Sequence, residues 1–146
     1  MGARVVGWQV KRIKVLLADD HDPFRRTLRR LLESNPDVEV VGEAENGRMA
    51  VEQADRLAPD VVVMDIAMPE INGLAATRLI RKRLAHVRVV VLTVHDSEEY
   101  VSAAFDSGAS AYVLKEEMRE ALLPALVRVC QESESDPDQH EGHVSH

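Results

Sequence analysis

The chain has 146 residues, of which 45% are hydrophobic and 29% are charged, a balance typical of one soluble domain with a substantial core. Its 25 acidic and 18 basic side chains give a formal net charge of −7, which argues against a surface that binds nucleic acid through the phosphates. Aromatic residues make up only 3%, so few rings are present to stack on bases.

The single cysteine and the short apolar runs indicate the cellular compartment in which the protein is expected. One cysteine excludes an internal disulfide and favours a reducing environment. No apolar run approaches the ~20 residues of a membrane helix. Residues 1–12 also lack the uninterrupted apolar stretch and cleavage site of a signal peptide. We therefore expect a cytoplasmic domain that binds neither a membrane nor nucleic acid.

The negative charge is concentrated at the end of the chain. The last sixteen residues, QESESDPDQHEGHVSH, contain five acidic residues and no Lys or Arg. Such a polar segment buries too little apolar surface to fold, so we predict a disordered tail over residues 131–146. Its His140, His143 and His146 recur every third residue, and a solvated role is favoured over a metal site in a tail of this kind.

Short, Val-rich apolar segments predict strands. They lie at residues 13–18, 38–44, 61–65, 87–93 and 111–115. Their continuous rather than alternating apolar character is typical of strands buried on both faces of a parallel sheet.

Longer segments between and after these strands have the apolar spacing of helices. The predicted helices begin at Asp22 as N-cap before Pro23, after Asn46, at about Leu74, after Ser97 and at about Arg119. The last one runs to Cys130 although Pro124 lies in its interior, where proline removes a backbone hydrogen bond. Five strands alternating with five helices predict a doubly wound α/β fold with helices on both faces of the sheet.

Polar side chains follow four of the predicted strands. Asp19 and Asp20 end the first strand, Asp65 the third, Thr93 the fourth and Lys115 the fifth. Because the carboxyl ends of parallel strands meet at one edge of the sheet, where doubly wound proteins bind ligands, we expect these side chains to converge.

The residue types at this edge indicate phosphoryl chemistry. Clustered carboxylates repel one another unless a cation neutralises them, and oxygen ligands without His or Cys suit Mg²⁺. A carboxylate beside such a cation can act as a nucleophile and form an acyl phosphate. Lysine and threonine side chains would then meet the phosphoryl oxygens.

Three long segments carry all five positions: VLLADDHDPFRRTLRRLL, VVVMDIAMPEINGLAATRLIR and VVVLTVHDSEEYVSAAFDSGASAYVLKEE. Together they resemble the receiver domain of bacterial two-component response regulators, most closely the group that carries a LuxR-type helix-turn-helix output domain. The resemblance covers residues 12–130, which we predict as the receiver domain, after an N-terminal extension at residues 1–11. It implies a flavodoxin-like, five-stranded parallel sheet of order 2-1-3-4-5 with five helices.

The resemblance also implies a role for each acidic residue. Asp65 would accept a phosphoryl group from a histidine of a sensor kinase in a magnesium-dependent reaction. Asp20 would bind Mg²⁺ directly and Asp19 through water. Asp65 itself and the backbone carbonyl of Ala67 would complete the protein ligands of the metal.

The remaining positions would respond to the phosphoryl group. Thr93 would hydrogen-bond it, Lys115 would pair with it, and Tyr112 would move inward as the switch aromatic. Ala67 stands where many receivers have a polar side chain, and His95 lies two residues after Thr93. Both border the path of the attacking water in the family, so we expect them to tune the phosphoryl lifetime.

Two other functions stay open on the sequence. One is a phosphatase or hydrolase that forms an aspartyl phosphate, although such enzymes usually have a second acid where this chain has Ala67. The other is a pseudo-receiver that binds partners without being phosphorylated. Our preferred hypothesis is a receiver rather than an enzyme, with its own dephosphorylation as an open activity.

The output and the partners are less defined than the site. No output domain follows residue 130 in this sequence, so the expected target is a downstream effector protein or, in a longer regulator, a LuxR-type DNA-binding domain. A phosphorylation-dependent homodimer is a further expectation. Four arginines on the first helix, Arg25, Arg26, Arg29 and Arg30, form a basic face, for which a solvated surface is favoured over a docking patch.

Overall fold

The computed structural model describes residues 4–6 and 9–133. In chain order the elements are β1 (Arg4–Val6), β2 (Gln9–Lys11), β3 (Ile13–Ala18), α1 (Asp22–Glu33), β4 (Val38–Ala44), α2 (Gly47–Leu57), β5 (Val61–Met64), α3 (Gly73–Arg83), β6 (Arg88–Thr93), α4 (Glu98–Asp106), β7 (Ala111–Leu114), a 3-10 turn (Lys115–Glu117) and α5 (Met118–Ser133). Every predicted strand and helix is present, within a few residues of its expected bounds.

The central sheet has five parallel strands in the order β4-β3-β5-β6-β7. Counted along the domain this order is 2-1-3-4-5, so the predicted topology is confirmed. The order reverses beside β3, where β4 lies on one side and β5 on the other. In sheets of this type the crevice beyond the carboxyl ends at such a reversal is the usual binding position.

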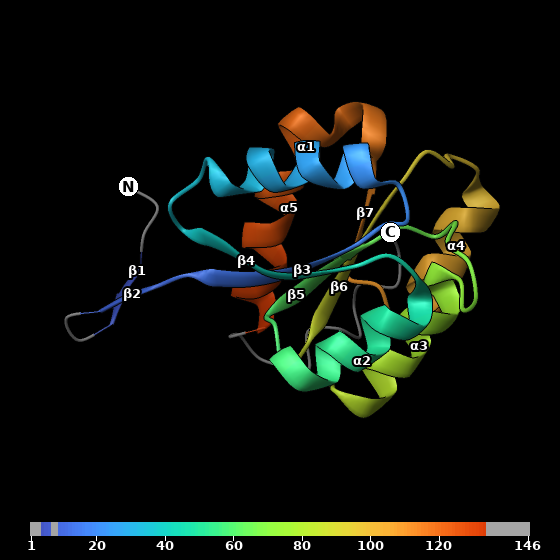
Figure 1. The fold of residues 1–146 in the computed structure, drawn as a ribbon, viewed down its shortest axis with the longest axis horizontal. Helices are drawn as coiled ribbons and strands as arrows, with labels where there is room; N and C mark the ends of the chain where they lie inside the picture. Colours follow the sequence, from blue (N-terminus) through green and yellow to red (C-terminus); the bar gives the residue numbers. More distant parts are fainter. Residues whose placement is uncertain (1–3, 7–8, 134–146) are drawn as a thin grey trace.

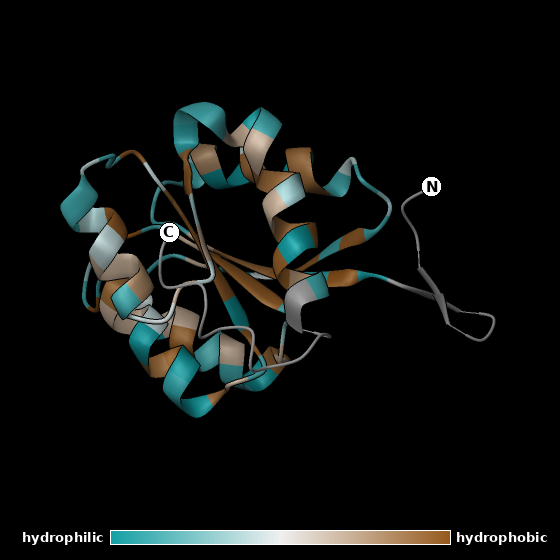
Figure 2. Cartoon of the chain, turned by 180° about the vertical axis from the view of Figure 1, so that it is seen from behind, coloured by the Kyte–Doolittle hydropathy of each residue, from teal (hydrophilic) through white to brown (hydrophobic). Residues whose placement is uncertain are grey.

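Helices cover both faces of the sheet, as Figure 1 shows. Because successive strand residues point to opposite faces, Val15 and Leu17 of β3 pack with α1 and α5, whereas Leu16 and Ala18 pack with α2 and α3. The apolar sheet lies inside and the polar sides of the helices face outward (Figure 2). Burial on both faces explains why these strands are continuously apolar.

Helix ends follow the sequence closely, with one exception. The side chains of Asn46 and Ser97 accept hydrogen bonds from the N–H groups of Met49 and Tyr100 and so cap α2 and α4 as predicted. The prediction of Asp22 as the cap of α1 was wrong. His21 has the extended backbone of an N-cap and makes no side-chain capping bond, so Asp22 is already the first helical residue.

Three short elements were not predicted, namely β1, β2 and the 3-10 turn. An antiparallel hairpin, β1 and β2, precedes β3 and lies outside the five-stranded sheet (Figure 1). The last helix also begins one residue earlier and continues to Ser133, three residues past the expected end. The predicted tail from residue 134 onward lies outside the described residues, and the domain bounds therefore stay a prediction. Among the helices that the structure describes, none has the length and apolarity needed to span a membrane.

Pro124 lies inside α5, which continues on both sides of it. A proline there removes one backbone hydrogen bond of the helix, so Pro124→Ala is expected to raise the free energy of unfolding by up to about 3 kcal/mol. Chemical denaturation measures this change. The exposed Arg128 on the same helix supplies a control, since Arg128→Ala should change stability by less than about 0.5 kcal/mol. A less stable Pro124→Ala variant would contradict the prediction.

Candidate functional site

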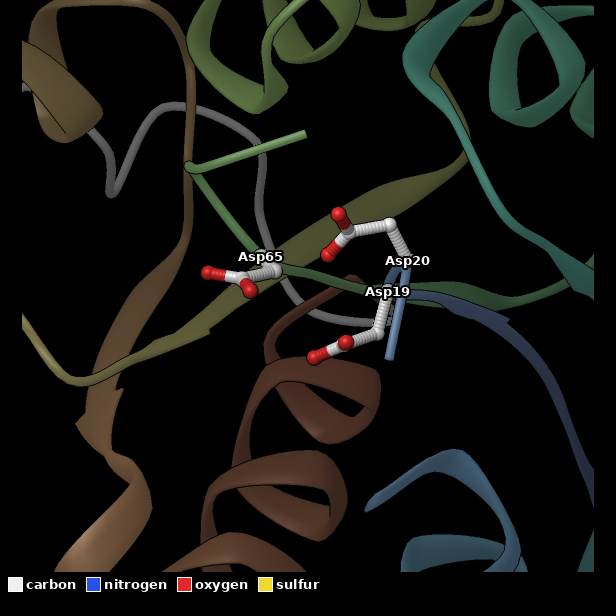
Figure 3. Close-up of side chains that lie close together, drawn as sticks. All are labelled: Asp19, Asp20 and Asp65. Carbon is white, nitrogen blue, oxygen red and sulfur yellow. The ribbon is translucent and has the colours of Figure 1, made fainter. Parts of the chain in front are cut away.

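Three aspartates meet at the carboxyl edge of the sheet (Figure 3). The backbone N–H of Asp19 donates to Ala44 O and that of Asp65 to Ala18 O, each at 3.0 Å, so both residues extend the strand pairing by one position. This register brings one carboxylate oxygen from each of Asp19, Asp20 and Asp65 within 4.8 Å of the others. The predicted convergence of these residues is present in the fold.

Lys115 joins two of these carboxylates. Its Nζ lies 2.8 Å from Asp19 Oδ2 and 3.2 Å from Asp65 Oδ2. The same ammonium lies 4.1 Å from the centre of the Phe24 ring, a cation–π distance. Phe24 lies on α1, partly buried against the core, and no motif of the sequence marked it as part of the site. The Phe24 ring therefore packs against the core and also contacts the Lys115 ammonium.

The charges at this edge shift one another's titration. Burial raises the pKa of Asp65, and neighbouring Asp19 raises it further, although Lys115 acts in the opposite direction. Burial lowers the pKa of Lys115, but the two aspartates outweigh it and leave that pKa above its ordinary value. The lysine is therefore held charged while the carboxylates remain crowded. A divalent cation or a charged ligand oxygen would relieve this crowding.

The donor set fits a magnesium ion. The described cluster consists of carboxylate oxygens alone, without histidine or cysteine, which is the chemistry that hard cations prefer. Asp19 is buried and accepts a hydrogen bond at 2.8 Å from the backbone N–H of His21, whereas Asp20 is exposed. One carboxylate thus faces the protein and another faces solvent, through which an ion and its waters would enter.

Thr93 and Tyr112 are connected through the backbone of His95. Thr93 Oγ1 is fully buried and accepts from the His95 N–H at 3.4 Å. The Tyr112 hydroxyl donates to the His95 carbonyl at 2.7 Å, and the His95 ring stacks on Tyr100 with centroids 4.4 Å apart. Burial raises the pKa of Tyr112, which keeps this hydroxyl protonated. The β6–α4 loop is therefore tied to both predicted switch residues.

A close backbone approach shapes the loop after Asp65. The Ala67 N–H donates to Asp65 Oδ1 at 3.4 Å, and the Gly73 N–H donates to Ile66 O at 2.8 Å. A Cβ at position 73 would lie only 1.9 Å from the Asp65 carbonyl oxygen, so this position requires glycine. Asn72 caps α3 directly beside it. The Asn-Gly pair thus closes the loop that carries the Asp65 carboxylate.

The basic face predicted on α1 is divided. Arg26 and Arg30 are exposed, as a solvated surface requires. Arg25 and Arg29 instead pair with Glu43 of β4. Helical spacing alone did not distinguish the exposed arginines from the paired ones, because their acidic partner, Glu43, lies on β4.

Comparisons with known proteins agree with this architecture. The family model "Response regulator receiver domain" matches residues 15–127. The transcriptional regulatory protein DegU of Brevibacillus brevis is 43% identical over 120 residues, which cover 82% of this chain and 51% of DegU. The chain spans about half the length of the curated relatives it matches.

Solved structures show the same likeness. A LuxR-family two-component response regulator from Aurantimonas sp. has a TM-score of 0.80 at 32% identity, covering 90% of this chain and 94% of that one. The isolated REC domain of RcsB from Salmonella enterica serovar Typhimurium, solved in the presence of the phosphomimetic BeF3⁻, has a TM-score of 0.76 at 27% identity, covering 83% and 90%.

The fold and the site define a class of protein: a doubly wound α/β domain with clustered aspartates and a lysine at the carboxyl edge of its sheet. The chain belongs to the response regulator receiver domain family of two-component systems, as its motifs predicted. Its close relatives are mostly transcriptional regulators.

Gly73 offers a test of the loop geometry. Gly73→Ala is expected to lower the free energy of unfolding by about 2 kcal/mol or more, because the new methyl group overlaps the Asp65 carbonyl and forces the backbone to move. Denaturant unfolding measures the loss. Lys82→Ala, at an exposed position of the same helix, is the control and should be nearly neutral. A Gly73→Ala variant as stable as the parent would show that the loop moves aside freely.

Asp65→Asn tests the crowding of the carboxylates. In a chelating buffer at about pH 7 this variant should be more stable than the parent by about 1 kcal/mol, because a buried ionised carboxylate is removed. Since folding raises the pKa of Asp65 above its ordinary 3.8, the parent loses this penalty as the pH falls through the raised value. Denaturant unfolding at about pH 7 and about pH 4 should therefore show a shrinking difference. A variant less stable than the parent at neutral pH would mean that the contact with Lys115 dominates.

Proposed function

We propose that this chain is a phosphoacceptor receiver that takes a phosphoryl group on Asp65 from a histidine of a sensor kinase. The observation that carries the proposal is the Lys115 ammonium between Asp19 and Asp65, with an Asp20 oxygen in the same 4.8 Å cluster. This arrangement combines a nucleophile, a fixed positive charge and a set of oxygen ligands for a cation. Phosphoryl transfer requires mainly such positioning and charge neutralisation.

The transfer balances as a single displacement. A carboxylate oxygen of Asp65 attacks the phosphorus of a phosphohistidine, so that a P–O bond forms while the P–N bond breaks. The electron pair of the broken bond stays on the imidazole nitrogen. The Lys115 ammonium, 3.2 Å from Asp65 Oδ2, is placed to pair with the new phosphoryl oxygens.

Magnesium fits this proposal as the cofactor. Asp19, Asp20 and Asp65, together with the backbone carbonyl of Ala67, would hold it. When bound it would neutralise the carboxylates and the phosphoryl oxygens, which is charge compensation that the protein lacks on its own.

Thr93 and Tyr112 would convert the phosphoryl group into a change of shape. The Thr93 hydroxyl would hydrogen-bond a phosphoryl oxygen, and the backbone of His95 would then transmit its movement to Tyr112. Phosphorylation would favour one arrangement of this loop and of α4, as a shift in population. Ala67 and His95 would affect how long the phosphoryl group persists.

The proposed output is a protein contact in the cytoplasm. Because the relatives are mostly transcriptional regulators, the target would be a downstream effector or a LuxR-type DNA-binding domain, reached with or without a phosphorylation-dependent homodimer. The chain would thus act as a switch rather than as an enzyme on other substrates. The exposed Ala67 in place of a second acid supports this choice over a phosphatase.

Phosphorylation can be tested directly on the full chain. Incubation with Mg²⁺ and acetyl phosphate should add the mass of one phosphoryl group in intact mass spectrometry. Asp65→Asn should abolish the addition, because it removes the nucleophilic oxygen. Asp55→Asn, which changes an exposed carboxylate of α2, is the matched control and should be phosphorylated normally.

The other outcomes identify the alternative functions. An Asp65→Asn variant that is phosphorylated like the parent would overturn the assignment of the acceptor. A parent that neither gains mass nor responds to beryllofluoride would be a pseudo-receiver. Many turnovers of a generic phosphate ester, lost in Asp65→Asn, would instead establish a phosphatase.

A further inference from the structure

Arg25 of α1 contacts the backbone of the metal-binding edge rather than facing solvent. Its side chain is 12% exposed, and its guanidinium donates to acceptors in three different segments. Nη1 lies 2.5 Å from the backbone carbonyl of Asp19, and Nε lies 2.7 Å from Glu43 Oε1. The third contact is with Asp22 at the start of α1.

Glu43 anchors this arginine to β4. Its second carboxylate oxygen pairs with Arg29 of the next helical turn, so both oxygens have partners. Burial would raise the pKa of Glu43, but the two guanidinium groups lower it below its ordinary value. The carboxylate therefore stays ionised and keeps its charged hydrogen bond to Arg25 Nε.

The carbonyl that Arg25 binds belongs to the peptide unit joining Asp19 to Asp20. A peptide unit is planar, so fixing its oxygen also fixes the direction in which the chain leaves toward Asp20. Asp19 has further contacts through Lys115 and the His21 N–H. Within the described part of the chain, no hydrogen bond or ion pair holds the exposed Asp20 carboxylate. Its position therefore depends on the backbone.

We propose that Arg25 is a positioning residue of the magnesium site, which orients Asp20 through the Asp19 carbonyl. The inference rests on the proposed function, because it assumes that these aspartates bind Mg²⁺. The charge of the guanidinium cannot explain such a role, since a nearby positive charge weakens cation binding. What Arg25 supplies is geometry. A lysine in its place would keep the charge but could not reach three acceptors with one planar group.

Arg29 provides a matched control. It belongs to the same helix and binds the same Glu43, yet its described contacts do not include the backbone of Asp19. Arg25→Lys and Arg29→Lys each keep the positive charge and disturb the pairing with Glu43. Only the first also removes the guanidinium donor from the Asp19 carbonyl.

The test is a Mg²⁺ titration of the full chain by isothermal calorimetry, with thermal unfolding followed by circular dichroism in chelator. Arg25→Lys should weaken Mg²⁺ binding by about tenfold, as the loss of an outer-shell partner does in other metal sites. Arg29→Lys should bind Mg²⁺ within about twofold of the parent. Both variants should unfold at a lower temperature than the parent, because both disturb the contact between α1 and β4.

Three results would overturn the inference. Parent-like Mg²⁺ affinity in Arg25→Lys would show that the guanidinium does not position the site. Equal weakening in both variants would show that α1 acts only by general loosening. A parent that binds no Mg²⁺ would instead refute the proposed metal site itself, and the role of Arg25 with it. If Arg25→Lys does not fold, Arg25→Gln replaces it and Arg29→Gln, which loses the same charge, becomes the control. Equal Mg²⁺ affinity in these two variants would then overturn the inference.

Discussion

The site depends on one interaction, the Lys115 ammonium between the buried carboxylates of Asp19 and Asp65. Two carboxylates cannot remain ionised in a buried place without a compensating charge. The ammonium supplies part of it at 2.8 and 3.2 Å, but three carboxylates face one lysine. In the proposed function, this unbalanced negative charge would provide the affinity for a cation and would make the site sensitive to an added phosphoryl group.

The parallel sheet makes this interaction possible. Asp65 and Lys115 are far apart in the sequence, yet they follow β5 and β7 at the same edge. Lys115 then begins a 3-10 turn that leads into α5, whose buried face packs with α1 against the sheet. Phe24 of α1 contacts the lysine from that side. The packing of α1 and α5 on the sheet therefore also determines where the Lys115 ammonium lies.

The sequence predicted the strands well because burial on both faces leaves a continuous apolar pattern that is easy to detect. It predicted the caps at Asn46 and Ser97 because these depend on residues three positions apart. The cap of α1 was misassigned, because Asp is a common N-cap residue and only the backbone conformation shows that His21 holds the cap position. The hairpin at β1 and β2 was missed, because two strands of three residues carry little pattern of their own.

The sequence by itself determined the residue types at the edge of the sheet: Asp19, Asp20, Asp65, Thr93 and Lys115 each end or follow a strand that its own composition identifies. Only the tertiary structure decided which of them touch. In the fold, Lys115 forms ion pairs with Asp19 and Asp65, and Asp20 remains exposed. The Arg25 guanidinium donates a hydrogen bond to the Asp19 carbonyl. The local pattern of apolar residues indicates whether a segment is buried. These contacts instead depend on the register between strands and on how α1 packs over the sheet.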